Sequence, residues 1–180
     1  GIETIFKCKK INPDVKLLVF IVPQNSKNTN KSGLEKKLTT FNELSPDQKI
    51  NIIMEEDCKK EKYLNYLLQE DLGLNILVTT PAQIYGNGSI KNPIGNNICN
   101  ICNPKQIIWI IDEIHKNTQL FGAFSKTTKA KESGRAENPD NLNKIKDLNE
   151  SIRSSFVIGM TATAKEIFYY HRMYLENNME

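Results

Sequence analysis

The chain has 180 residues, 39% of them hydrophobic and 25% charged, and this composition is typical of a soluble globular protein and disfavours disorder. The length suits one domain with a substantial core. The net charge of +3 permits a nucleic-acid partner without requiring one. The longest apolar runs, residues 17–22 and 107–111, are too short to cross a bilayer. Because no signal-peptide pattern follows Gly1, we expect an intracellular protein without a membrane partner.

Short apolar runs along the chain predict β-strands. They cover residues 17–22, 76–78, 107–111 and 156–160, with a less regular run at 49–54. These runs are apolar on both faces, which is typical of parallel strands that are buried on both sides. Helical periodicity lies between them, at residues 2–10, 58–69 and 145–154. The alternation predicts an α/β three-layer sandwich with a mainly parallel sheet.

Two stretches have the composition of loops. Residues 86–105 are rich in Gly, Pro and Asn, and residues 125–143 are polar with almost no apolar side chains. We therefore expect both to be loop insertions in a single domain that spans residues 1–180. The second insertion carries a basic cluster that could touch phosphates but is better explained as a solvated loop, namely Lys126, Lys129, Lys131 and Arg135.

Two adjacent acids, Asp112 and Glu113, follow the apolar run of residues 107–111, and His115 comes two positions later. Carboxylates at the end of a buried strand are costly unless a bound group uses them. In nucleotide hydrolases the first such acid holds Mg²⁺, and its neighbour can polarise the attacking water. The alternative is a solvated acidic turn, which the strongly apolar run and His115 disfavour.

Small and hydroxyl-bearing residues follow the run at 156–160. Thr161 and Thr163 alternate there with alanine, so their hydroxyls can reach a neighbouring acid or imidazole. A threonine here can equally cap a helix that starts near Lys165. The two roles are compatible.

Polar residues also follow two other predicted strands. Pro23, Gln24 and Asn25 come after the first run, and Thr80 and Pro81 come after the run at 76–78. Because ligands bind at the carboxyl ends of the strands in open α/β sheets, these turns suit sequence-independent contacts to phosphates and sugars.

Taken together and in this order, the motifs resemble those of the superfamily 2 helicases, the DEAD/DEAH-like ATPases. The resemblance runs from about Leu17 to Ala164. Residues 112–115 resemble the Walker B box in its Asp-Glu-x-His form, and residues 161–163 resemble the Ser/Thr-Ala-Thr motif. Pro-Gln at 23–24 and Thr-Pro at 80–81 match weaker motifs of the family. The resemblance implies a RecA-like, P-loop NTPase fold and an ATP-dependent helicase or translocase.

The resemblance also implies roles for individual residues. Asp112 would coordinate Mg²⁺, Glu113 would be the catalytic base, and both would lie at the bound ATP. His115 would bridge to Thr161 and Thr163 and so link the nucleotide state to domain movement.

A second group of residues would lie on the nucleic-acid face, which holds DNA or RNA. Its members follow the first and third predicted strands and are Pro23, Gln24, Asn25, Thr80 and Pro81. A second RecA-like domain would supply the other half of the nucleic-acid track.

One motif of the family is missing, because no Gly-x-x-x-x-Gly-Lys-Ser/Thr occurs in the sequence. We expect a truncated domain whose phosphate-binding loop lies upstream of Gly1, with residues 2–10 as the following helix. On that basis the chain alone is inactive as an ATPase. The alternative is a non-hydrolysing RecA-like scaffold that has lost the loop. A motor subunit of a nuclease or methylase, as in restriction enzymes, is a third possibility.

Cys99 and Cys102 have the spacing of a zinc knuckle. A structural zinc needs four ligands, and the remaining Cys and His residues are scattered along the sequence. A redox pair would need a helix that begins at Cys99, and no helix is predicted there. Two ordinary thiols are the preferred interpretation.

Overall fold

The computed structural model describes residues 7, 9–23, 26–44, 50–69, 73–86, 90, 92–114 and 147–161. Every predicted strand is present. The strands are β1 (Leu17–Ile21), β2 (Ile50–Ile53), β3 (Leu74–Thr79), β4 (Ile107–Ile111) and β5 (Phe156–Gly159). All neighbouring pairs are parallel, and the order across the described sheet is β2-β3-β1-β4-β5. The predicted α/β fold with a parallel sheet is therefore confirmed.

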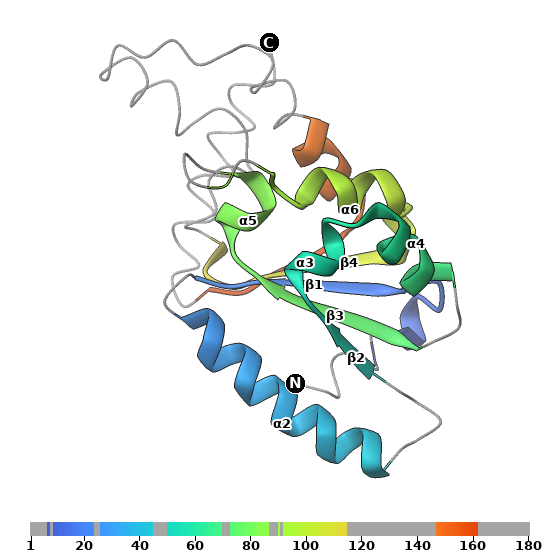
Figure 1. The fold of residues 1–180 in the computed structure, drawn as a ribbon, viewed down its shortest axis with the longest axis vertical. Coiled ribbons are helices and arrows are strands. Elements are labelled where there is room, and N and C mark those ends of the chain that lie inside the picture. The colour runs from blue at the N-terminus through green and yellow to red at the C-terminus, as the bar shows by residue number, and fades with distance from the viewer. Residues whose placement is uncertain are drawn as a thin grey trace.

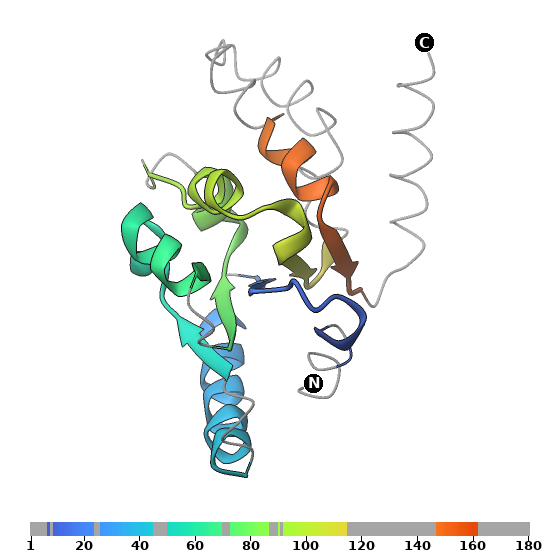
Figure 2. The ribbon, with the colours of Figure 1, turned by 90° about the vertical axis from the view of Figure 1, so that its right-hand side faces the viewer.

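The described helices lie on both faces of this sheet. Their bounds are α2 (Lys27–Leu44), α3 (Glu55–Cys58), α4 (Glu61–Gln69), α5 (Pro81–Tyr85), α6 (Gly95–Ile101), the 3-10 helix η3 (Pro104–Gln106) and a helix over residues 147–153. Figures 1 and 2 both show α2 on one side of the sheet and α3, α4, α5 and α6 on the other. The chain thus forms the predicted three layers.

Two apolar clusters fill the spaces between the layers, and the alternation of side chains along each strand divides residues between them. In β1, Leu17 and Val19 face the cluster under α4 and α6, whereas Leu18 faces the cluster under α2. In β4 the fully buried Trp109 belongs to the first cluster and Ile108 to the second. The prediction of strands buried on both faces is therefore confirmed for the apolar runs that form β1 and β4.

One strand departs from that pattern. β5 lies at an edge of the described sheet and is only partly covered, so that 53% of Phe156 is exposed. A strand at an edge has a neighbour on one side only, and its apolar sequence therefore does not guarantee burial. The prediction that all the apolar runs are covered on both faces was wrong for β5.

The prediction of a loop at residues 86–105 was also wrong in part. This segment contains α6 and η3, and Ile94 and Ile98 are fully buried beneath α6. The Asn-rich sequence of α6 has poor helix propensity. The helix forms because these two isoleucines are four residues apart and bury the same face against the sheet. Tertiary packing has overridden local propensity.

Helix α2 was not predicted at all. Its sequence is mostly polar, and only Leu34, Leu38 and Phe41 contact the cluster beneath it. The second predicted insertion, at 125–143, and most of the helix predicted at 2–10 lie outside the described residues. None of the helices in the described part of the chain combines the length and apolar character that a bilayer span requires.

Candidate functional site

The carboxyl ends of the strands meet along one edge of the sheet, nearly level with one another. Ile21 pairs with Thr79 on one side and Ile111 on the other, and Ile111 pairs with Gly159. The residues that follow these positions therefore emerge at the same level. This register brings the predicted motifs to one edge even though they lie far apart in the sequence.

The acidic pair forms a tight turn between β1 and β5. The Asp112 amide donates to the carbonyl of Ile21 at 2.9 Å, so the turn begins against the end of β1. The Glu113 amide donates to Oδ1 of Asp112 at 3.0 Å. Beyond it, the Ile114 amide donates to the carbonyl of Met160 at 3.0 Å. Both acidic residues are half-buried in this turn.

Glu113 has a backbone φ of 50°, and it is the one non-glycine residue with positive φ in the described part of the chain. An L-residue in this left-handed region carries roughly 1–2 kcal/mol of strain. Such strain persists only where the surroundings impose it, and it concentrates at functional sites. Here the hydrogen bonds of Asp112 and Ile114 hold the turn on both sides.

Thr161 lies beside this turn. The Met160 amide donates to the carbonyl of Ile111 at 2.8 Å, and the Met160 carbonyl accepts from Ile114, so the chain leading into Thr161 runs along the acidic turn. The approach is close: a Cβ on Gly159 would lie 2.5 Å from Cδ1 of Ile114. The glycine therefore allows the acidic turn and the Thr161 segment to come together. The structure brings Asp112, Glu113 and Thr161 to adjacent strand ends, as the sequence predicted.

The turns after β1 and β3 are joined in a similar way. The Val22 amide donates to the Thr79 carbonyl at 2.9 Å, which sets Pro23 and Thr80 at neighbouring strand ends. Thr80 is 1% exposed, and its hydroxyl accepts from the Gln83 amide at 3.4 Å as the cap of α5. Its side chain thus has a structural task, and Pro81, at the start of α5, is the more exposed of the two.

A buried acid that the sequence analysis did not select lies at the same edge. Glu55, two residues beyond β2, is only 8% exposed. Its Oε1 accepts from the Thr79 hydroxyl at 2.6 Å, and its Oε2 lies 2.6 Å from Nζ of Lys27, the first residue of α2. The available signal was an acid directly after an apolar run, the same signal that identified Asp112.

Four of the predicted site residues lie outside the described residues: Gln24, Asn25, His115 and Thr163. The predicted bridge from His115 to the two threonines, and the predicted nucleic-acid contacts of Gln24 and Asn25, therefore stay predictions.

The acidic turn has the kind of ligand that Mg²⁺ prefers, but it does not by itself make a complete nucleotide site. Carboxylate oxygens are preferred ligands of this ion, which usually takes its remaining ligands from phosphates and water. Among the described residues, no three His, Cys, Asp or Glu side chains gather to hold a metal. The sequence also has no Gly-x-x-x-x-Gly-Lys-Ser/Thr to cradle phosphates.

The cysteine pair lies away from this edge. Cys99 is inside α6, not at its start or in a loop, and Cys102 follows the helix in the core. Burial raises the pKa of each thiol to about 12. Zinc binding and thiol exchange both need the thiolate, which is scarce at neutral pH under these conditions.

A comparison with protein families finds a match to the type III restriction enzyme, res subunit, over residues 2–166. No curated protein and no solved structure matches the chain significantly. The family match covers nearly the whole chain, and the chain belongs to this family, a helicase-like and ATPase-like branch of the superfamily 2 helicases.

Proposed function

We propose that this chain, as a member of the type III restriction enzyme res-subunit family, forms part of an ATP-dependent motor that moves along DNA or RNA. The observation that carries the proposal is the half-buried acidic turn, held against the ends of β1 and β5 with Glu113 in a strained conformation. A surface turn without a functional role would adopt an unstrained conformation, or it would carry, in place of Glu113, a residue that adopts this conformation at lower cost.

The proposed roles of Asp112, Glu113 and Thr161 follow from their positions, and those of Gln24, Asn25, His115 and Thr163 rest on the sequence motifs. Asp112 directs one carboxylate oxygen to its own turn, through the Glu113 amide, and its other oxygen would help to hold Mg²⁺, which when bound would supply charge neutralisation at the phosphates. Glu113 accepts a proton from the attacking water. Thr161, with Thr163 and His115, reports the state of this turn to the rest of the protein. Pro23, Gln24, Asn25, Thr80 and Pro81 form the nucleic-acid side of the same edge.

Catalysis in this proposal needs parts that the sequence does not contain. A phosphate-binding loop and a second RecA-like domain would have to complete the site. We therefore expect the 180-residue chain by itself to show no measurable ATP hydrolysis, and strong nucleic-acid-stimulated turnover by the chain alone would contradict this assembly.

The test is an ATPase assay on a two-domain polypeptide that includes this chain and a phosphate-binding loop. Glu113→Gln removes the base while keeping the size of the side chain, and we expect it to lower kcat by about 10²–10⁴-fold with nucleotide binding retained. Thr39→Val, on the exposed face of α2, is the matched control and should leave turnover unchanged. If the Glu113→Gln enzyme turns over at the wild-type rate, Glu113 is not the base.

The family match favours DNA as the track, because the family is described by a restriction enzyme. In that case the motor would serve a DNA-cleaving assembly. The same ATPase assay distinguishes the possibilities: stimulation by double-stranded DNA and not by RNA supports the restriction role, whereas the reverse supports an RNA motor. If the extended protein binds partners but neither binds nor hydrolyses ATP, it is the non-hydrolysing scaffold.

A further inference from the structure

The buried Glu55 is placed where it can hold two turns of the sheet edge together. We infer that Glu55 is a positioning residue that ties the start of α2, after β1, to the end of β3, so that the two turns proposed to contact nucleic acid act as one rigid surface. This inference rests on the proposed function and extends it to a residue that no motif includes.

The contacts of Glu55 reach both turns. Thr79 donates its hydroxyl to Oε1 of Glu55, and the next residue, Thr80, caps α5. On the other side, Lys27 contacts Oε2 and follows a turn closed by Ser26, whose amide and hydroxyl both bond to the Pro23 carbonyl at 3.0 Å. One carboxylate therefore spans from the Pro23 turn to the Thr80 turn.

The charges of Glu55 and Lys27 would each be unfavourable where they lie if the two residues were not paired. A carboxylate buried as deeply as Glu55 is stable only when both oxygens have partners. Lys27 begins an 18-residue helix whose first turn holds no acid, and a cation at a helix N-terminus is disfavoured by the helix dipole. The ion pair compensates both costs. Lys31, one turn further along α2, approaches Sδ of Met54 at 2.9 Å and adds a second link to the same segment.

The alternative is that Lys27 contacts a phosphate directly and that Glu55 has no role in positioning the two turns. The two possibilities predict opposite signs for Glu55→Gln. Removing a negative charge beside a phosphate track should strengthen binding by simple electrostatics. Loss of a positioning tie should instead weaken it, even though the net charge of the protein rises.

The experiment is fluorescence anisotropy of labelled single-stranded DNA and RNA over a salt series, with the 180-residue chain and its variants. We expect Glu55→Gln and Lys27→Met each to weaken binding by about tenfold, and the double variant to be no worse than either single one because both break one tie. The dependence of affinity on salt should keep its wild-type slope in Lys27→Met. A direct phosphate contact would lower that slope by about 0.7 on single strands.

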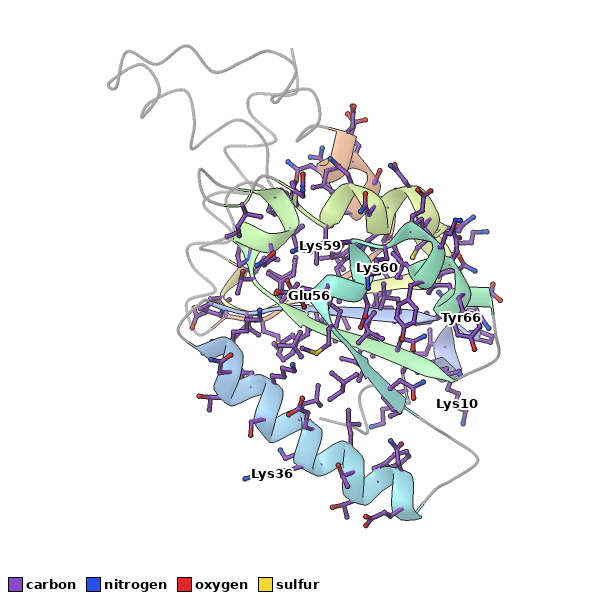
Figure 3. All side chains as sticks on the ribbon, in the orientation of Figure 1. Lys10, Lys36, Glu56, Lys59, Lys60 and Tyr66 are labelled. Atoms are coloured by element: carbon purple, nitrogen blue, oxygen red, sulfur yellow. The ribbon has the colours of Figure 1, made fainter. Side chains whose placement is uncertain are left out.

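Matched variants separate positioning from charge and from stability. Lys36→Met removes the same charge from the exposed far side of α2, where Lys36 projects away from the sheet (Figure 3), and should not weaken binding tenfold. Leu34→Ala destabilises α2 without touching the tie, and it should leave affinity unchanged well below its melting temperature. Thr79→Val should weaken binding and Thr79→Ser should restore it, because only serine keeps the hydroxyl.

The outcomes separate the two levels of the argument. If wild-type chain binds and Glu55→Gln binds equally well or more tightly, the positioning role is overturned and the nucleic-acid function stands. If Glu55→Gln does not fold, the affinity of Thr79→Val and the salt slope of Lys27→Met decide the question. If only the two-domain polypeptide binds nucleic acid, the same variants are compared in it. If neither that polypeptide nor the wild-type chain binds DNA or RNA, the nucleic-acid function itself is overturned, and the positioning role falls with it.

Discussion

The close approach of β5 to the acidic turn predicts that a single methyl group at Gly159 will disturb the site. In Gly159→Ala the new Cβ would lie 2.5 Å from Cδ1, 3.1 Å from Cγ2 and 3.3 Å from Cβ of Ile114. Rotation about χ2 moves Cδ1 and rotation about χ1 moves Cγ2, but Cβ moves only with the backbone of Ile114. That backbone is bonded to Met160 and follows Glu113 directly.

We expect the substitution to cost roughly 2 kcal/mol, in the range found for overpacked cores. For a chain of this size that corresponds to a melting temperature lower by about 4–8 °C. The backbone φ of Gly159 is not in the left-handed region, so strain of the alanine itself does not add to the effect. The predicted loss comes from the contact with Ile114 alone.

The assay is thermal and urea unfolding followed by circular dichroism and by the fluorescence of Trp109, the single tryptophan. Trp109 is fully buried in β4, next to β5, and so reports on the affected strands. Gly33→Ala is the matched control, because a Cβ on Gly33, within α2, meets nothing within 4 Å. It should stabilise the chain by about 0.5–1 kcal/mol. The same substitution thus has opposite signs at two sites.

The double variant Gly159→Ala/Ile114→Val tests the cause. Valine lacks Cδ1, the closest atom, so the cost of Gly159→Ala should fall by about 1 kcal/mol in this background. If Gly159→Ala melts at the wild-type temperature, or if its cost is the same in the wild-type and Ile114→Val backgrounds, the acidic turn is not held against β5 in the way described.

Two further predictions follow from backbone strain and from thiol burial. Glu113→Asn should raise stability by about 1 kcal/mol, because asparagine tolerates positive φ, whereas Glu113→Gln should not; equal melting temperatures for both would contradict strain at this residue. Burial, the largest cause, raises the pKa of Cys58, Cys99 and Cys102 to about 12 in the folded chain, above the 9.0 of an exposed thiol. The folded state therefore holds these protons more tightly, and the resulting stability is complete below about pH 9 and is lost as the pH rises towards about 12. Urea unfolding between about pH 8 and 11 should show a smaller alkaline loss in Cys58→Ala than in wild type, and an identical loss would contradict the shift.

The strands could be predicted because their signal is local. Runs such as residues 107–111 are apolar at every position, and only a strand buried on both faces uses such a run efficiently. The order of the strands in the sheet was not predicted, whereas their common carboxyl edge follows from parallel crossovers. This is why the acidic pair and Thr161 could be expected at one place from sequence alone.

The elements that were missed depend on contacts that a local window does not contain. α2 presents only Leu34, Leu38 and Phe41 to the core, a spacing of four and three residues within a polar sequence. α6 forms on an Asn-rich segment because Ile94 and Ile98 pack beneath it. In both cases a sparse apolar stripe outweighs poor composition, and a search for i, i+4, i+7 spacing would have found the first of them.

Glu55 illustrates the same limit at the level of the site. Its partners are 28 and 24 residues away in sequence, on α2 and β3. The position directly after an apolar run is the one local signal at Glu55, and it does not show that Glu55 is buried whereas its neighbour Glu56, in the same acidic run, is exposed. The side chain of Glu55 reaches Thr79 because of the register of β2 against β3, in which Ile53 pairs with Leu77.

The end of β1 joins the two halves of the sheet edge. The Ile21 carbonyl accepts from Asp112, and the next residue, Val22, donates to the carbonyl of Thr79, whose hydroxyl binds Glu55. A series of hydrogen bonds and covalent bonds therefore runs from the acidic turn to the tie beneath the proposed nucleic-acid turns. Contiguity alone does not establish energetic coupling. It does mean that any movement of Asp112 relative to β1 must be accommodated within two residues of the Pro23 turn. A motor would need the state of its nucleotide to affect the conformation of that turn.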